Sequence, residues 1–410
     1  MKLARRTVII AKVTAIVLLC AILAPVAAYT EEPARSQTQQ DDQNAAGSVM
    51  PELKVNARSA LLMEPLTGKI LLAQNEHEKL PPASVTKVMS MLLIFEALDQ
   101  GRINWDDIVT TSEHAASMGG SQIYLEAMET QPVRDLVKAI VIASGNDAAV
   151  AMAEFIAGSE DAFVTMMNNR AKELGMNDTH FVNSCGLDAD GHYTSAYDIA
   201  IMSRELITKH TKIFEYSTIW MDKIIHKTAR GQDEFGLSNT NRLLKSYPAT
   251  TGLKTGSTSK ALYCISATAE KNGLSLNAVV LGAPDPNTRF GEAIKMMDYG
   301  FANYAMANGD ATETVIGDVP VNKGEQERVK VKVSAQVHAL IPKGKSTEME
   351  KKIESVSSLK APFKEGTKAG EIIYYYEGKE VGRSELVTCS GVTRAGLGET
   401  MRRTLERWLE

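Results

Sequence analysis

A long apolar stretch, Val88–Leu98, follows the proline pair Pro81-Pro82 and contains neither Pro nor Gly. With the residues just before it, this stretch is long enough for about four helical turns. Apolar residues would cover nearly every side of the helix, which predicts a position in the protein interior. Its first turn nevertheless carries Ser84 and Lys87. At a spacing of three residues, a hydroxyl and an amine lie on one face of a buried helix.

A second helical pattern is interrupted by a polar turn. Pro132–Ala143 and Ala148–Ile156 both read as helix, and Ser144-Gly145-Asn146-Asp147 separates them. The apolar residues on either side are suited to a core. We therefore expect the polar turn to face a functional site.

Two further helices have recognisable ends. Ser159–Leu174 is followed by Gly175, a residue typical of the position after a helix. Ser195 and Asp198 match a capping box, which predicts a helix from there to Ile207.

The segments before and after these predicted helices are rich in β-forming residues. Ser59–Met63 and Lys69–Ala73 predict a hairpin, and Leu262–Ala269 and Leu276–Leu281 predict another around Asn272-Gly273. Lys254-Thr255-Gly256 falls on a strand just before the second hairpin, and Thr288–Ala307 predicts a helix that closes the domain.

The segments at the chain ends complete a five-part organisation. Residues 1–28 read as an export signal, with a basic start, an apolar core and a small-residue cleavage site, and residues 29–50 read as a polar flexible linker. We assign 51–310 to a catalytic domain, 311–390 to a small β-rich domain and 391–410 to an amphipathic helix. In that helix Leu397, Met401, Leu405, Trp408 and Leu409 fall on one side.

Composition excludes several classes of function. Removing the signal leaves 41 basic residues (45 − 4) against 50 acidic residues, a net charge of −9, and no basic stripe is visible, so we expect no nucleic-acid partner. The three cysteines left, Cys185, Cys264 and Cys389, do not form a disulfide framework. The histidines show no metal-binding spacing, so we expect neither a metal nor a cofactor.

The buried Ser84–Lys87 pair has a chemical interpretation and a plain one. Burial lowers the pKa of a lysine, and a neutral amine beside a serine hydroxyl is a nucleophile with its base. Alternatively, Ser84 caps the helix and Lys87 reaches solvent. The order Ser84-Val85-Thr86-Lys87, Ser144-Gly145-Asn146, Lys254-Thr255-Gly256 favours the chemical one, because these three motifs together are typical of β-lactamases and penicillin-binding proteins.

With the residues around these motifs, the chain resembles the low-molecular-mass penicillin-binding proteins that are D-alanyl-D-alanine carboxypeptidases, from Val55 to Trp408. Ser90, where Thr is commoner, and Cys185 are mild departures. The resemblance implies an α/β (α+β) fold: a transpeptidase/β-lactamase-like domain with an antiparallel sheet between helical layers, then an all-β domain. It implies peptidoglycan pentapeptide stems ending in D-Ala-D-Ala as substrate and β-lactam antibiotics as covalent inhibitors.

Acyl transfer then gives each residue an expected role. Ser84 attacks the carbonyl and Lys87 takes its proton, while repulsion from Lys254 helps to keep Lys87 neutral. Ser144 relays a proton to the leaving D-alanine, and Asn146 binds the peptide amide or orients Lys87. Lys254 and Thr255, with Gly256 and Ser257 beside them, bind the substrate carboxylate. The resemblance places the oxyanion between the backbone N–H groups of Ser84 and Ser257.

Two competing functions remain. A class A-like β-lactamase needs a glutamate that activates the deacylating water, and Glu173 is the nearest match, although a place in the last turn of a helix explains it better. A non-catalytic peptidoglycan-binding protein would need a broken motif, and all three are intact.

Smaller expectations concern single residues and the location of the enzyme. We expect His192 to hydrogen-bond to backbone, Cys264 to be a core residue and Cys185 to be exposed. The C-terminal helix is expected to bind an anionic membrane surface, which would hold the exported enzyme at the outer face of the cytoplasmic membrane, in the cell wall space. The rival expectation is that this helix packs on the β-rich domain.

Overall fold

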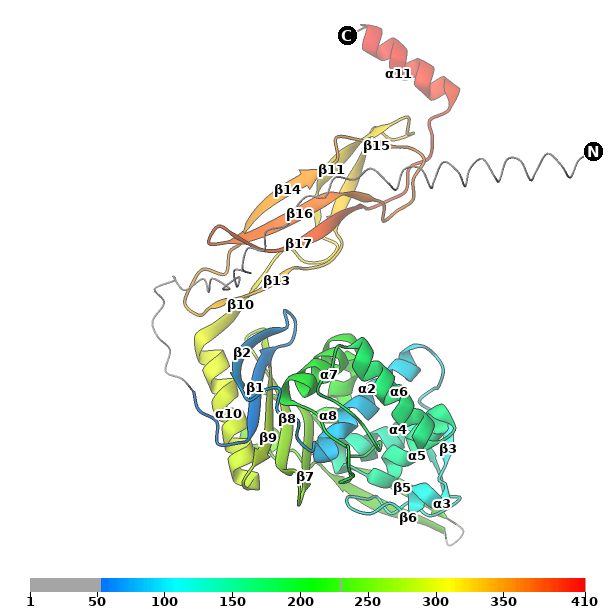
Figure 1. Ribbon diagram of the computed structural model, residues 1–410. Helices are drawn as coiled ribbons and strands as arrows, with labels where there is room; N and C mark the ends of the chain where they lie inside the picture. Colours follow the sequence, from blue (N-terminus) through cyan, green and yellow to red (C-terminus); the bar gives the residue numbers. More distant parts are fainter. Residues whose placement is uncertain (1–52, 229–230, 410) are drawn as a thin grey trace, which may run out of the picture. The chain divides into compact units, whose positions relative to one another are not determined.

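The computed structural model describes residues 53–228 and 231–409. The predicted export signal (1–28) and the predicted linker (29–50) lie outside these residues. Figure 1 shows the arrangement of helices and strands.

A five-stranded antiparallel sheet forms the centre of the first domain, in the order β2-β1-β9-β8-β7. Its strands are β1 (Ser59–Glu64), β2 (Lys69–Gln74), β7 (Thr250–Thr258), β8 (Leu262–Lys271) and β9 (Leu274–Ala283). Both predicted hairpins are confirmed. Asn272 and Gly273 have positive φ angles of 55° and 75°, as a tight turn between two strands requires.

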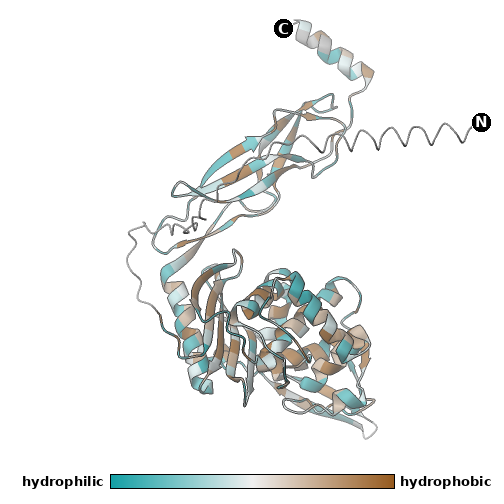
Figure 2. Cartoon of the chain, in the orientation of Figure 1, coloured by the Kyte–Doolittle hydropathy of each residue, from teal (hydrophilic) through white to brown (hydrophobic). Residues whose placement is uncertain are grey.

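Helices cover both faces of this sheet (Figures 1 and 2). Because side chains alternate along a strand, Leu62 and Val280 pack with α10 (Pro286–Asn303), while Leu61 and Val279 pack with the larger helical group on the other face. That group includes α2 (Lys87–Asp99), α5 (Asn146–Ala157), α6 (Glu160–Glu173) and α7 (Ala196–Lys209). The predicted sheet between helical layers is therefore confirmed.

The helix α2 lies in the middle of the larger core, as its apolar pattern predicts. Ten of its thirteen residues are buried, including Lys87. Ser84, however, is not part of the α-helix, because it lies in a short 3₁₀ turn, η1 (Ala83–Thr86), that precedes Lys87. The prediction that Ser84 opens the helix was thus wrong in detail, although the two residues stay one turn apart.

The interrupted helix also differs in detail from its prediction. An α-helix, α4 (Val133–Lys138), widens into a π-helical segment, η2 (Ala139–Ala143), and ends at Ser144, whose φ of 63° is left-handed. The break arises because the chain turns at Ser144 before α5 begins at Asn146.

Ser195 caps α7 as predicted, since its Oγ accepts from the Asp198 N–H. The Asp198 carboxylate does not complete the capping box, because it accepts from Asp178 N and Thr179 Oγ1 instead.

A hairpin that the sequence analysis did not predict projects beside this helical group. It consists of β5 (Met221–Thr228) and β6 (Gly231–Ser238), paired antiparallel. Other small elements are β3 (Ile108–Thr110), β4 (Thr130–Pro132), α3 (Glu113–Ala116), η3 (Thr211–Ile213), α8 (Phe214–Ser217) and α9 (Leu243–Ser246).

The predicted helix Thr288–Ala307 is too long. It ends at Asn303, because Tyr304 adopts an extended backbone, and Tyr304–Asn308 forms strand β10 paired with β13 (His338–Pro342). The β-rich domain then contains a sheet in the order β14-β16-β17-β12-β11-β15. These strands are β11 (Val315–Asn322), β12 (Arg328–Val333), β14 (Glu350–Ser355), β15 (Leu359–Lys360), β16 (Lys368–Tyr376) and β17 (Lys379–Thr388).

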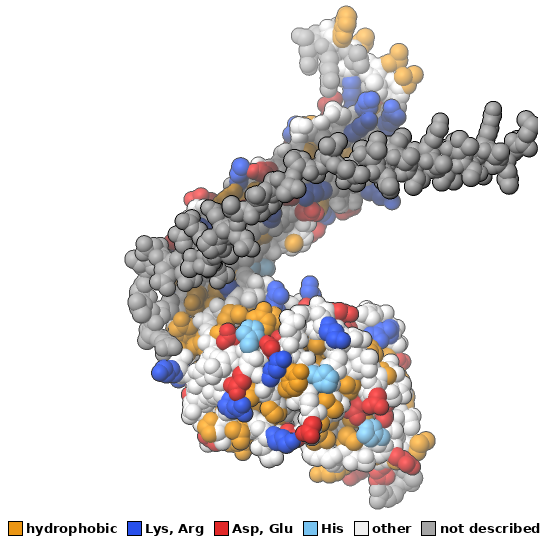
Figure 3. Space-filling model, viewed as in Figure 1, with side chains coloured by type: hydrophobic (Ala, Val, Ile, Leu, Met, Phe, Trp, Pro, Cys, Tyr) orange, Lys and Arg blue, Asp and Glu red, His pale blue; other side chains and the backbone are white. Residues whose placement is uncertain are grey.

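The last element is the amphipathic helix α11 (Leu397–Leu409). Leu397, Met401, Leu405 and Trp408 are all at least 66% exposed, so they form an apolar surface that the described chain does not cover. Figure 3 shows hydrophobic side chains on the outside of this helix. Within the described ranges, no helix is both long and apolar enough to cross a membrane.

Candidate functional site

Three segments that are distant in the sequence meet at Ser84. The turn η1 packs against β7 so closely that a Cβ on Gly256 would lie 2.8 Å from the Ser84 backbone nitrogen. A side chain at position 256 would therefore push the strand away from the turn. This contact places the strand that carries Lys254 and Thr255 directly beside the backbone of Ser84.

The Lys87 amine connects η1 to the Asn146 turn and to the loop of Cys185. It is fully buried, and its Nζ lies 2.5 Å from Asn146 Oδ1, 2.8 Å from the Cys185 carbonyl oxygen and 3.1 Å from Ser84 Oγ. A neutral amine has two hydrogens and one lone pair. Donation to Asn146 and Cys185 uses both hydrogens, so the lone pair is left to accept the proton of Ser84.

Burial is the main reason why this amine can be neutral. It lowers the pKa of Lys87 to about 8, although Cys185 and Asp147 partly oppose the shift. Lys254 is also buried, and its pKa is lowered well below the usual value, first by burial and then by repulsion from Lys87 and Arg289. Burial is thus the largest cause at both lysines, and the expected repulsion lowers the pKa of Lys254, while the causes found for Lys87 do not include Lys254.

The polar turn before α5 faces this site, as predicted. Asn146 accepts from Lys87 and donates through Nδ2 to the Gly119 carbonyl oxygen at 2.6 Å. Ser144 is almost fully buried, and its Oγ has no hydrogen-bond partner among the described residues. A buried hydroxyl without a partner costs about 1–3 kcal/mol, so its presence at a reactive centre suggests a role with substrate.

The next residue, Asp147, was not identified from the sequence. Its buried carboxylate accepts from the backbone N–H groups of Ile123, Leu125 and Ala148, at 2.9–3.2 Å. It thereby ties the loop of residues 119–125 to the Asn146 turn. The only sequence signal was its position directly after Ser144-Gly145-Asn146.

On the strand, Lys254 and Thr255 are both buried. Lys254 Nζ donates to the Thr255 carbonyl oxygen at 3.0 Å, and Thr255 Oγ1 donates to Thr240 Oγ1 at 2.7 Å. Ser257 follows Gly256 and is exposed. Arg289, also missed in the sequence, reaches the same strand from α10 and donates to the carbonyl oxygens of Gly256 and Cys264.

A glycine loop holds the other side of η1. Asn183 Oδ1 accepts from the N–H groups of Gly186 and Leu187, which fixes the loop. Gly186 has a φ of 89°, and a Cβ there would lie 1.9 Å from the Ala83 carbonyl oxygen. No side chain fits in this position.

The expectations for His192 and Cys185, both in this loop, and for Cys264 on β8 had different outcomes. His192 does bind backbone: its Nδ1 accepts from the Val182 N–H, and its Nε2 therefore donates to Thr86 Oγ1 at 2.8 Å. Burial lowers the pKa of His192 to about 4, so the ring is neutral at pH 7. Cys185 was expected to be exposed, but it is buried because its carbonyl faces Lys87 under η1. Cys264 is buried as predicted.

Glu173 has a structural role. It ends α6, its side chain is 65% exposed, and it pairs with Arg170 at 3.1 Å.

Among the described residues, no group of three His, Cys, Asp or Glu side chains is arranged to hold a metal ion.

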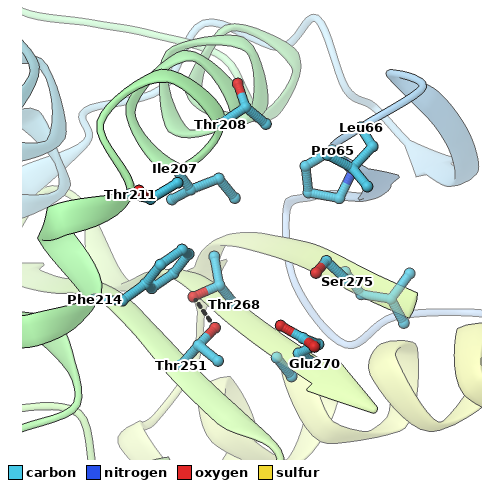
Figure 4. A pocket seen from close by; sticks show the side chains of 12 residues that line it. Pro65, Leu66, Ile207, Thr208, Thr211, Phe214, Thr251, Thr268, Glu270 and Ser275 are labelled. Carbon is cyan, nitrogen blue, oxygen red and sulfur yellow. Dashed lines mark hydrogen bonds between the residues drawn. The ribbon is translucent and has the colours of Figure 1, made fainter. Parts of the chain in front are cut away.

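A mainly apolar cavity of about 190 Å³ lies elsewhere, between the β1–β2 turn, the end of α7 and strands β7 to β9 (Figure 4). Thr251 Oγ1 donates to Thr268 Oγ1 across its floor, and Glu270 is its one acidic side chain. It contains none of the residues of the three motifs, so the candidate chemistry does not take place there.

Comparison with known proteins agrees with this geometry. Residues 43–285 match the family model for D-alanyl-D-alanine carboxypeptidases, and residues 310–394 match the C-terminal domain of penicillin-binding protein 5. The chain is 42% identical to the D-alanyl-D-alanine carboxypeptidase DacF of Bacillus subtilis (88% of this chain, 92% of DacF). It is 34% identical to DacD of Escherichia coli (83% and 87%).

Solved structures show the same similarity. Penicillin-binding protein 5 from Haemophilus influenzae superposes with a TM-score of 0.69 at 31% identity, over 84% of this chain and all of that one. Penicillin-binding protein 6B from Escherichia coli gives a TM-score of 0.63 at 33% identity, over 84% and 99%.

The two glycines of the 183–193 loop provide a test of how Ser84 is positioned. Gly186→Ala should reduce acylation of Ser84 by a penicillin at least a hundredfold, because the new Cβ displaces the turn η1. Gly191→Ala is the matched control, since Gly191 also has a positive φ (83°) but its nearest neighbour is 3.8 Å away. The rate of mass increase on the intact protein measures acylation. Equal losses in both variants would show that backbone strain, and not the contact with η1, causes the effect.

Proposed function

Because the chain belongs to the D-alanyl-D-alanine carboxypeptidase family, we propose that it removes the terminal D-alanine from peptidoglycan stem peptides through an acyl-enzyme on Ser84. The observation that carries this assignment is the Lys87 amine, which is buried, has its two hydrogens engaged and lies 3.1 Å from Ser84 Oγ.

The reaction begins with Ser84 as nucleophile and Lys87 as base. As Oγ attacks the carbonyl between the two D-alanines, its proton passes to Lys87 Nζ. Negative charge develops on the carbonyl oxygen, and the backbone N–H groups of Ser84 and Ser257 are the proposed donors to it. The close contact at Gly256 supports this arrangement, because it brings the two backbones together.

Departure of D-alanine requires a proton on its nitrogen. Ser144 is the proposed relay between Lys87 and the leaving group, supported by its buried Oγ without a partner among the described residues. Asn146 holds Lys87 and can also accept or donate to the substrate amide. Water then cleaves the acyl-enzyme.

The substrate ends in a carboxylate, and the proposed clamp for it is Lys254 and Thr255. The pKa of Lys254 is lowered by burial and by the neighbouring cations, so the charged form is costly in the free enzyme. A substrate carboxylate would supply the missing counter-charge and restore it. Arg289 adds positive charge behind the same strand.

A β-lactamase would need a deacylating glutamate near Ser84, and Glu173 is exposed and paired with Arg170. We therefore expect β-lactams to acylate Ser84 and to be released slowly.

The test of function uses a pentapeptide and a penicillin. The wild type should release D-alanine from the pentapeptide and gain the mass of one penicillin, because both react at Ser84. Ser84→Ala should do neither while unfolding at the same temperature. A penicillin adduct on the alanine variant would refute the role of Ser84. Rapid penicillin hydrolysis without D-alanine release would instead favour the β-lactamase alternative.

The pH dependence tests the role of Lys87. Since the pKa of Lys87 is lowered to about 8, its neutral fraction rises roughly tenfold per pH unit below 8 and levels off above it. The limiting acylation rate at saturating penicillin should follow this curve, because the bound carboxylate keeps Lys254 protonated. Lys87→Arg, which stays charged, should lose acylation at every pH. A rate that is constant from pH 6 to 9 would exclude Lys87 as the base.

We also propose that the enzyme is exported by residues 1–28 and held at the outer face of the cytoplasmic membrane by α11. The support is the exposed apolar surface of Leu397, Met401, Leu405 and Trp408. Arg402 on the same helix is 58% exposed and suits anionic headgroups, an attraction on the order of 1 kcal/mol that its ion pair with Glu399 partly offsets. Arg403 faces the chain instead: it donates to the carbonyl oxygens of Gly324 and Glu325 and so connects the helix to the β-rich domain.

Flotation with anionic vesicles tests the anchor. The mature protein should float with the vesicles, less so at high salt, and a version ending at Cys389 should remain in solution. Trp408→Ser keeps the helix and the Arg403 contacts, and it should weaken flotation because Trp408 is 87% exposed. Equal flotation of the mature and shortened proteins would contradict the proposal.

A further inference from the structure

An aromatic side chain is displayed beside the reactive centre in an unusual backbone conformation. Tyr124 is 69% exposed and has a φ of 60°. Its neighbours Ile123 and Leu125 are buried, and their N–H groups are held by the Asp147 carboxylate. The left-handed conformation costs a residue with a side chain roughly 1–2 kcal/mol, and such residues often mark ligand contacts. The hydrogen bonds of Asp147 to the two neighbouring N–H groups hold this conformation, and the Tyr124 side chain faces solvent as a result.

Tyr124 and Glu126 form one wall of a cavity of about 310 Å³, and the other residues that line it belong to the hairpin β5–β6. The ring of Phe235 meets that of Tyr124 edge to face at 5.9 Å. Gln232 and Asp233 contribute polar side chains to the lining. This volume is near the lower end of the range for ligand pockets, about 300–1,000 Å³, so it suits a single ring-sized group.

His226 in the cavity wall has an unused hydrogen-bonding atom. Its Nδ1 lies 2.7 Å from Glu129 Oε1, and that carboxylate also accepts from Gln131 Nε2 and Glu126 N. Because a carboxylate oxygen accepts, Nδ1 donates to Glu129. His226 Nε2 is buried and has no hydrogen-bond partner among the described residues. The contact with Glu129 and the edge-to-face packing against Phe235, at 5.5 Å between ring centroids, hold this ring in the cavity wall.

The loop that lines the cavity also contacts the Asn146 turn of the site. Asn146 binds Lys87, and its backbone N–H donates to the Ser121 carbonyl oxygen of this loop. Tyr124 is three residues from Ser121, at most about 10 Å of extended chain, whereas an extended pentapeptide spans about 17 Å. The length of a stem whose D-Ala-D-Ala end is at Ser84 thus exceeds the span from the Asn146 turn to Tyr124, which supports a sugar-bearing end at the cavity.

We propose that this cavity binds a sugar ring of the peptidoglycan glycan strand, an inference that rests on the proposed function. Tyr124 and Phe235 offer an apolar surface for the C–H face of the ring, and Gln232 and Asp233 offer partners for its hydroxyl and amide groups. The negative charge of Asp233 would repel the carboxylate of a stem glutamate, so that side chain is a poorer occupant of the cavity than a sugar. The diamino acid of the stem adjoins D-Ala-D-Ala and is too close to Ser84 to reach this position.

Steady-state kinetics with three substrates tests the proposal: diacetyl-lysyl-D-alanyl-D-alanine, a free pentapeptide and a disaccharide-pentapeptide. The variant is Tyr124→Asn, because Asn tolerates the left-handed conformation. Met221→Ala is the matched control, an exposed residue at the base of the same hairpin, outside the cavity.

We expect Tyr124→Asn to lower kcat/KM about tenfold on the disaccharide-pentapeptide, mainly through KM, with less than a twofold change on the two peptides. Met221→Ala should change none of them. An equal loss on all three substrates would overturn the proposal in favour of a structural role through Asp147. A loss on the free pentapeptide equal to that on the disaccharide-pentapeptide would assign the cavity to the peptide instead. No change on any substrate would also overturn it. Wild-type D-alanine release from the tripeptide is the separate check on the proposed function.

Discussion

The desolvation of one amine is the constraint on which the site depends. Lys87 lies under η1 with two oxygen partners, and burial brings its pKa to about 8. Three neighbouring elements stabilise the partly neutral form of this amine. The apolar helix α2 removes water, the Asn146 turn supplies one acceptor and the Cys185 loop supplies the other. A lysine in water keeps its usual high pKa, so at neutral pH a much smaller fraction of its amine would be free to act as a base.

The sequence was sufficient for those features that depend on local pattern. The helix α2, both sheet hairpins and the glycine after α6 follow from periodicity and turn chemistry. Two of the motifs identified residues that meet at Lys87, Ser84 and Asn146, and the third identified the strand that packs against the Ser84 backbone. The outline of the fold came from resemblance and is confirmed by the layers of helix on both faces of the sheet. The roles of the site residues remain proposals.

What the sequence could not show arises from contacts between distant segments. Asp147 is important because three backbone N–H groups from two segments point at it, and Arg289 because α10 crosses behind β7. Cys185 is buried by η1, nearly one hundred residues earlier in the chain. The end of α10 at Asn303 was misplaced because Tyr304–Asn308 has a helix-compatible composition and becomes a strand only by pairing with β13.

The two glycines that hold η1 limit how this enzyme can evolve. Gly186 contacts the turn from one side and Gly256 from the other, each with no room for a methyl group. Selection for drug escape therefore has little freedom at the nucleophile, because any change there alters the geometry for peptide and antibiotic alike. A substitution that weakens the antibiotic but preserves the reaction with the peptide must therefore lie further from Ser84, at a residue that contacts only one of these two ligands. An inhibitor confined to the space between these glycines would be the hardest for the enzyme to exclude.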